Sequence, residues 1–310
     1  MRVALICTGK LELYGLKDGL TAAFPGQDFH CVPFATTPGG QMTPFNSFTS
    51  ARLPKKILQE PDSSLSELVG ATIDELYPVR KSDLVFVLDD LELCNKGNDA
   101  VVVKEFGRAI TRHLQRIHAV DKFAVKSIQQ ILRDSVSFHL AVPMIESWLF
   151  ADPTGPSKAR VPMHQLSPLL QAGCDPEDFA TDDTDYEQDQ GQSCTKWCSL
   201  GQRNNSRPEW LKTGLKREEH PKRYLAWLCR APGERNCSTY AEVPDGARAL
   251  AQLDWATALA VPLHMRYLRS FMVDLVDALG VVPSGWSIEG QEADSTSVKT
   301  VGSRTILRNI

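Results

Sequence analysis

Acidic side chains lie within four residues of the ends of three strand-like runs of this sequence, RVALICT, LVFVL and VSFHLAV. The acids concerned are Glu12, Asp89, Asp90, Glu92 and Glu146. Ligands of an open parallel sheet bind beyond the carboxyl ends of its strands, so these carboxylates are expected to meet at one edge of a sheet. Clustered carboxylates raise one another's pKa and cost stability unless a cation neutralises them.

A hard divalent cation takes carboxylate oxygens as ligands, and Mg²⁺ keeps positions open for phosphate and water. The five acids therefore predict a site for Mg²⁺ or Mn²⁺, with metal-assisted hydrolysis as its chemistry. One or two ions would polarise a phosphate and activate a water, while Glu12 moves a proton. Asp90 is the second candidate catalytic residue, and Lys10 is a candidate phosphate contact beside the ion.

Each of these residues also has a structural explanation. Glu12, early in a helix, would interact favourably with the helix dipole. Asp89 or Asp90 could cap a helix, Glu146 could lie on a helix surface, and Lys10 at a turn could face solvent. The joint placement of the acids after three strands favours the functional interpretation.

The elements that would position the acids alternate along the first half of the chain. β-Rich runs predict strands, and helical spacing of apolar residues predicts helices between them. The strands are expected at 2–8, 29–35, 84–89 and 136–142, and the helices after the first strand and at 64–76, 100–119 and 143–153. This alternation predicts an α/β domain over residues 1–155, with a mostly parallel sheet flanked by helices. Within the third strand, alternation places Asp90 and Glu92 on one side and Asp89 on the other.

Residues 156–286 have a different composition, which predicts a helical extension with a polar insertion. A run of acids between Asp175 and Asp189 is typical of a solvated loop. Helices are expected at 244–258 and 263–279, packed against the first unit, and residues 287–310 are expected to form a frayed polar tail.

A basic and aromatic segment, residues 203–227, lies within the extension. Cations on phosphates and aromatic rings stacked on bases are typical of nucleic-acid binding. The candidate contacts are Arg207, Lys212, Lys216, Lys222 and Arg223, with Trp210, Tyr224 or Trp227 as stacking faces. The alternative is an amphipathic helix, HPKRYLAWLC, whose aromatic residues belong to the core.

Seven of the eight cysteines fall into two groups. Cys7, Cys31 and Cys94 lie in or beside apolar runs, where free cysteine behaves as a small hydrophobe. A four-cysteine zinc site is the alternative chemistry for a second group, Cys194, Cys198, Cys229 and Cys237. The spacing of this second group lacks the compact knuckle of zinc ribbons, and His220, a spare ligand, stands before Pro221 as a helix-start residue would.

The whole-chain composition narrows the function classes. No apolar run of the 310 residues approaches the length that spans a bilayer, and the N-terminus has no basic leader, so we expect a cytoplasmic protein without a membrane partner. The net charge of −4 gives no global attraction to nucleic acid, so such binding would need a local basic patch.

The segments CTGKLELYGL and VFVLDDLEL resemble the Toprim fold, which has a glutamate after its first strand and an acidic D-x-D-type cluster after its third. FHLAVPMIESWLFADP, HPKRYLAWL and PDGARALAQLDW resemble stretches of uncharacterised Toprim relatives and RloB-like proteins of bacterial defence systems. The resemblance covers about residues 1–260 and implies a Mg²⁺-dependent nuclease. In the family pattern that this resemblance implies, Glu12 is the general acid/base and the acids at 89–92 are metal ligands. Asp90 and Glu92 match the D-x-D motif only as D-x-E.

Two classes of function follow from this resemblance. The first is a Toprim-like nuclease of an anti-phage or mobile-element defence system. The second is a catalytically degenerate Toprim scaffold that binds nucleic acid, a partner ATPase or another defence subunit, and it too could form a homo-oligomer. A nucleotide hydrolase is a weaker alternative, because the sequence contains no G-x-x-x-x-G-K-[ST] phosphate loop.

Overall fold

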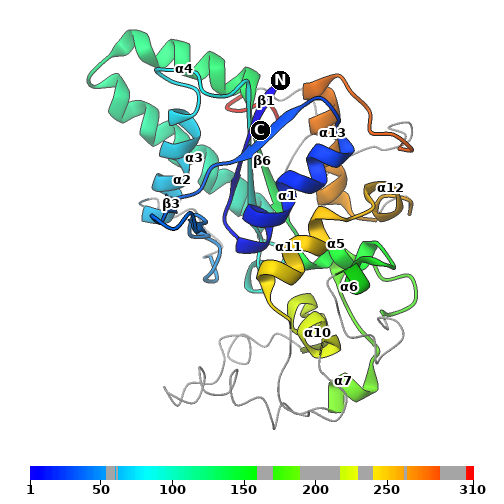
Figure 1. Cartoon of the computed structure of the whole chain (residues 1–310). Helices are drawn as coiled ribbons and strands as arrows, with labels where there is room; N and C mark the ends of the chain where they lie inside the picture. The colour runs from blue at the N-terminus through cyan, green and yellow to red at the C-terminus, as the bar shows by residue number, and fades with distance from the viewer. Residues whose placement is uncertain are drawn as a thin grey trace.

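A four-stranded parallel sheet in the order β2-β1-β5-β6 forms the centre of the computed structural model (Figure 1). The model describes residues 1–53, 60, 62–158, 170–188, 217–229, 240–261, 264–286 and 305–310. The strands are β1 (Arg2–Cys7), β2 (Asp28–Cys31), β5 (Leu84–Asp90) and β6 (Val136–Ala141). The predicted α/β fold, with helices flanking a parallel sheet and a helical C-terminal region, is confirmed.

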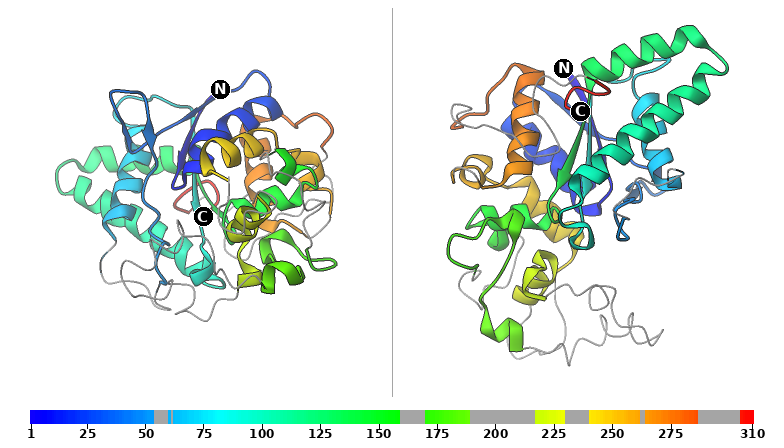
Figure 2. Two further views of the ribbon diagram at one scale, coloured as in Figure 1. Left: turned by 60° about the horizontal axis from the view of Figure 1, so that its bottom comes forward. Right: turned by 180° about the vertical axis from the view of Figure 1, so that it is seen from behind.

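Helices cover both faces of the sheet, which explains why its central strands β1 and β5 are nearly continuous apolar runs. One face packs against α2 (Ser63–Asp74), α3 (Asp99–His118) and α4 (Lys122–Ser135). The other face packs against α1 (Lys10–Ala23), α5 (Glu146–Ala151), α11 (Ala247–Ala251) and α13 (Arg266–Leu279). The two layers lie on opposite sides of the sheet in Figure 2.

Side chains of β5 alternate between these two cores. Val85 and Val87 belong to the core under α2, α3 and α4, whereas Phe86 and Leu88 belong to the core under α1 and α13. This period of two determines which face each residue at the end of the strand can reach.

The remaining elements are short. They are the hairpin of β3 (Ala35–Thr36) and β4 (Met42–Thr43), the helices α6 (Gly155–Lys158), α7 (Thr184–Gln188), α10 (Pro221–Leu228) and α12 (Trp255–Ala258), the 3-10 turns Leu93–Asn95, Pro176–Asp178 and Arg217–Glu219, and a wide turn at Glu242–Gly246. No helix in the described ranges has both the length and the apolar character needed to cross a bilayer.

The helices beyond residue 155 share a core with the sheet. Phe271 of α13 lies edge-on to Phe86 and to His139, with ring centroids 6.0 and 5.3 Å apart. Helix α11 lies so close to α1 that a Cβ at Gly15 would overlap the backbone of Ala247. The expected packing of the C-terminal helices against the first unit is therefore confirmed for the described residues, and no separate core marks a boundary at residue 155.

The acidic run between Asp175 and Asp189 is not a solvated loop in its described part, because Glu177 and Asp183 are buried and the Glu177 carboxylate accepts hydrogen bonds from Tyr267 N and Leu268 N.

Two helices also differ from the prediction. Helix α4 was not predicted, although Asp121 caps it by accepting hydrogen bonds from Phe123 N and Ala124 N. The helix expected at 244–258 is two helices, because Asp254 caps a new one at Trp255.

The prediction of a frayed tail is wrong for residues 305–310. The backbone N–H of Arg308 donates to Val136 O at 2.8 Å, and Leu307 is fully buried. Asn309 accepts from Phe138 N at 3.1 Å and donates to Phe138 O at 2.8 Å. The Arg308 guanidinium pairs with Asp274, which also bonds His139, so this segment is tied to β6 and α13. Residues 287–304 lie outside the described part of the chain.

Replacing Asn309 with alanine should lower the free energy of unfolding by about 1–3 kcal/mol, because it leaves the buried N–H and C=O of Phe138 without partners. Urea denaturation followed by circular dichroism measures this. The matched control is Gln115→Ala, which removes an exposed amide on α3. Equal stability of the two variants would contradict the assigned role of Asn309.

Candidate functional site

All five predicted acids lie around the carboxyl ends of three adjacent strands, and four of them are grouped here as one cluster. Glu12 is in the first turn of α1, which follows β1, and Asp90 is the last residue of β5. Glu92 lies two residues beyond β5, and Glu146 begins α5 after β6. We call Glu12, Asp90, Glu92 and Glu146 the carboxylate cluster. Each of Glu12, Asp90 and Glu92 has its pKa raised by at least one other member.

Glu12 is the most completely buried carboxylate of this cluster, with 1% of its surface exposed. Within the described residues, neither oxygen has a hydrogen-bond partner in another residue. Burial raises its pKa to about 8, with a further contribution from Glu146, whereas its own backbone amide and Lys222 act in the opposite direction. A buried acid with this pKa can hold or release a proton near neutral pH.

Gly9 makes room for the Glu12 carboxylate. Both Glu12 oxygens lie where a Cβ of residue 9 would be, so any other residue at position 9 would displace them. The backbone of Gly9 is extended, with φ at −110°, so space and not conformation requires the glycine.

Asp90 lies on the same face of the sheet as Glu12. It continues the row of Phe86 and Leu88, which belong to the core under α1. Its Oδ1 accepts a hydrogen bond from Ile145 N, at 2.9 Å, immediately before α5. Burial raises the pKa of Asp90 well above its usual value, and Glu12, Glu92 and Glu146 raise it further. Asp90 is therefore both a partner of a helix start, as the structural explanation held, and a member of the cluster.

Asp89 belongs to the opposite face of the sheet. It follows the row of Val85 and Val87, is fully buried, and accepts a hydrogen bond from the Thr8 hydroxyl. Burial raises its pKa to about 7 despite that bond. The predicted split between Asp89 and Asp90 is confirmed, and the structure does not bring Asp89 to the face that carries Glu12.

Glu92 is positioned by a turn and not by the strand. β5 ends at Asp90, and Glu92 has a left-handed backbone with φ of 62°, which costs energy for a residue other than glycine. Its N–H donates to Pro143 O at 2.7 Å, and its carbonyl accepts from Asn95 N at 3.0 Å. Burial and then Glu146 raise its pKa to about 7. Strand alternation therefore does not position Glu92, although its charge does raise the pKa of Asp90.

Glu146 is 2% exposed, so the helix-surface explanation is wrong. Its Oε1 lies 3.5 Å from the ammonium of Lys222, which also pairs with Glu242 in the wide turn before α11. Burial alone would lower the pKa of Lys222, but Glu146, Asp90 and the other cluster acids raise it above its usual value.

This position corrects the expectation that Lys222 belongs to a solvent-facing basic patch. Its neighbours Tyr224 and Trp227 are buried, with parallel rings 5.8 Å apart, so the amphipathic-helix alternative holds for α10. Arg223 is half-buried on the same helix, and His220 precedes the helix as expected, with a pKa lowered to about 3 by burial and then by Arg223 and Lys222.

Several predicted site residues lie outside the described part of the chain. They are Arg207, Trp210, Lys212, Lys216, Cys194, Cys198 and Cys237. Cys229 is buried at the end of α10, and the zinc site stays a prediction. Lys10 is exposed at the first position of α1. Cys7 is buried as expected, and Cys31 and Cys94 are half-buried.

The donors of the cluster suit a hard cation in their chemistry. All are carboxylates, and the buried oxygens of Glu12 lack partners in other described residues. In the described ranges, no group of three or more His, Cys, Asp or Glu side chains is arranged to hold a metal ion. Mg²⁺ needs only one or two protein carboxylates when phosphate and water complete its shell, and Glu12 and Asp90 offer the oxygen donors that such an ion takes.

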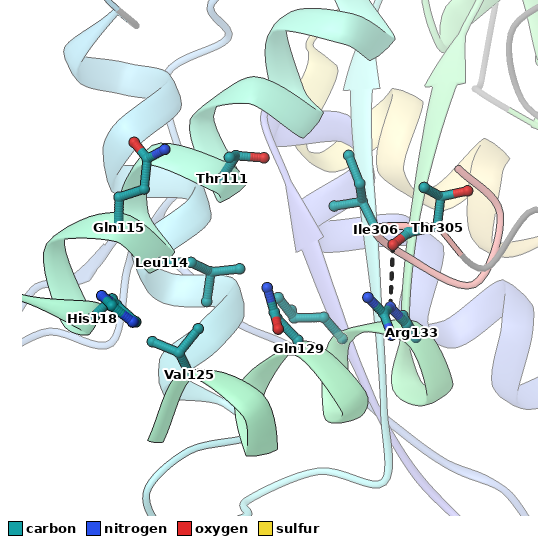
Figure 3. Close-up of a pocket in the computed structure, with 10 residues that line it drawn as sticks. Thr111, Leu114, Gln115, His118, Val125, Gln129, Arg133, Thr305 and Ile306 are labelled. Atoms are coloured by element: carbon teal, nitrogen blue, oxygen red, sulfur yellow. Dashed lines mark hydrogen bonds between the residues drawn. The ribbon is translucent and has the colours of Figure 1, made fainter. Parts of the chain in front are cut away.

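A cavity of about 300 Å³ lies elsewhere, between α3, α4 and the segment 305–310 (Figure 3). Arg133 donates to Thr305 O there at 3.1 Å. The cavity lies near the amino end of β6, and none of its lining residues belongs to the carboxylate cluster.

Sequence reasoning missed Glu242 and the true position of Lys222. Neither has a local signal, because both are brought to Glu146 by the packing of α10 and of the turn before α11.

No protein-family model matches this chain, and the searches of curated proteins and of solved structures gave no match either.

Gly9→Ala should destabilise the protein by about 1–3 kcal/mol, because the new methyl group displaces the Glu12 carboxylate from its buried position. In a Glu12→Ala background the same substitution should cost much less, since its obstacle is gone. Urea denaturation of the four proteins of this cycle measures the coupling. Gly39→Ala, in an open position, is the control. Additive effects of the two substitutions would contradict the assigned contact.

The stability of the metal-free protein should fall as the pH rises from about 5 to about 9. The folded-state pKa is about 8 for Glu12 and about 7 for Asp89 and Glu92, above the usual value of a carboxyl group. The folded protein thus binds protons that the unfolded chain has released, and it loses this stabilisation as they dissociate. Glu12→Gln should make the upper part of the profile less steep, leaving the contribution of Glu177, whose pKa burial also raises to about 8, and Asp18→Asn, exposed on the same helix, should not change it. A flat wild-type profile would refute the assignment.

Proposed function

We propose that this protein is a Mg²⁺- or Mn²⁺-dependent phosphodiesterase that hydrolyses nucleic acid. One observation carries the proposal: Glu12 is buried with two carboxylate oxygens that have no partner in another described residue, on the face of the sheet that also carries Asp90. An arrangement that costs stability is expected at a functional site, where a ligand completes it.

The residues of this chain would divide the chemistry among them. Glu12 and Asp90 would hold the ion, and Glu146 and Glu92 would add negative charge beside it. When bound there, Mg²⁺ would polarise the phosphate and lower the pKa of the attacking water. Burial raises the pKa of Glu12 to about 8 in the protein without metal, so Glu12 would release a proton when it takes up the ion. Asp90 is fixed for its part by the hydrogen bond from Ile145 N.

The resemblance to Toprim proteins supports the same activity and suggests a defence system as its context. In that context a partner ATPase or another defence subunit, or a second copy of this chain, would present the nucleic acid. The half-buried Arg223 and the cations Arg207, Lys212 and Lys216 are the candidate contacts with its backbone.

A scaffold without catalysis is the rival proposal, and a specific observation favours it. In the described ranges no three acids are arranged for one ion, and Lys222 already pairs with Glu146. A chain whose acids are permanently neutralised by its own lysine would bind nucleic acid or a partner without cutting.

A cleavage assay separates the two proposals. Wild-type protein is incubated with single-stranded DNA, duplex DNA and RNA in the presence of Mg²⁺, of Mn²⁺ or of EDTA. The enzyme proposal expects cleavage that EDTA abolishes and that Glu12→Gln or Asp90→Asn reduces at least ~10²-fold. Asp18→Asn should cut as the parent does, because its carboxylate is exposed and lies outside the cluster. Binding of nucleic acid without metal-dependent cleavage of any substrate would contradict the enzyme proposal and support the scaffold proposal.

A further inference from the structure

Lys222 has one charged partner inside the cluster and one outside it. Its ammonium lies 3.5 Å from Glu146 Oε1 and also pairs with Glu242. Glu146 is almost fully buried, whereas 31% of the Glu242 side chain and 34% of the Lys222 side chain are exposed. The lysine therefore lies at the entrance of the cluster, between a buried acid and an exposed one.

The charge of Lys222 acts on the cluster beyond Glu146. It lowers the pKa of Glu12 and of Glu92, in opposition to burial and to Glu146. A single ammonium is thus a counter-ion for several buried carboxylates. A divalent cation among the same acids would supply twice that charge and would repel the ammonium at close range.

We propose that Lys222 is a displaceable counter-ion, which neutralises the cluster in the metal-free protein and moves to a phosphate of the substrate when a divalent cation binds. This rests on the proposed function, because it requires the cluster to bind such a cation. The flexible four-carbon side chain of lysine allows the movement. Glu242 can keep its ion pair with Lys222, since it lies at the exposed side of the ammonium.

The proposal has a consequence for the order of binding. In the metal-free protein the ammonium is held by Glu146 and Glu242, so it has little capacity left for a phosphodiester. After exchange it would lie beside the carboxylate cluster with hydrogen-bonding capacity free for a phosphate oxygen. Metal is thus expected to bind before nucleic acid.

Chemical labelling of lysine amines tests the exchange in the full chain without any cleavage. The protein is acetylated at constant pH with and without Mg²⁺, and the rate at each lysine is measured by mass spectrometry. Lys222 should react several-fold faster with Mg²⁺, because release from Glu146 favours the free amine. A phosphorothioate oligonucleotide should then slow it again. Lys17, exposed on α1, should react equally in all conditions.

Metal affinity provides the second measurement, by Mn²⁺ titration followed by electron paramagnetic resonance. Lys222→Met should bind Mn²⁺ roughly tenfold more tightly than the parent, because the competing charge is gone. Lys17→Met should not change the affinity. If Lys222→Met does not fold, the labelling of the wild-type chain still decides.

The outcomes separate this inference from the nuclease proposal. Faster labelling of Lys222 with Mg²⁺, in a protein that cuts no nucleic acid, would support the counter-ion role of Lys222 and reject the nuclease proposal. Metal-dependent cleavage with unchanged labelling of Lys222 at saturating Mg²⁺ would support the nuclease proposal and reject the counter-ion role of Lys222. Absence of any Mn²⁺ binding by the parent and by Lys222→Met would overturn both.

Discussion

Coverage of both faces of the parallel sheet is the constraint on which the rest of this structure depends. Helices on each side bury the interiors of β1 and β5, which are apolar, so their polar side chains lie at the strand ends, whereas β6 carries the buried Ser137 and His139 within the strand. The carboxylates occur at the carboxyl edge for this reason. The C-terminal helices are equally a consequence, because without α13 and α11 the face that carries Phe86 and Leu88 would be open to water.

At that edge, desolvation dominates the electrostatics. Burial is the largest cause of the raised pKa of Glu12, Asp90 and Glu92, and repulsion within the cluster comes second. Lys222 offsets part of this cost without removing it, since the pKa of Glu12 still rises to about 8. The site thus stores unfavourable free energy in its metal-free form, and ligand binding can recover that energy.

The sequence was informative where a local pattern determines the structure. Short β-rich runs placed all four strands of the sheet, and strand alternation correctly separated Asp89 from Asp90. Helix α4 was missed although Ala124, Ile128 and Leu132 form an apolar row. Glu92, Lys222 and residues 305–310 could not be placed, because a left-handed turn, a tertiary ion pair and side-chain bonds to a distant strand determine their positions.

The segment that binds β6 also affects how the molecule behaves toward its own copies. β6 is an edge strand of the sheet, and an uncovered edge is a template for pairing with another chain. The side-chain amide of Asn309 forms hydrogen bonds with the backbone N–H and C=O of Phe138, and Arg308 N donates a hydrogen bond to the carbonyl of Val136. These bonds occupy the first half of the strand without adding a regular strand that could itself be extended. The last described residues of the chain therefore protect the β6 edge from pairing with the sheet of another molecule.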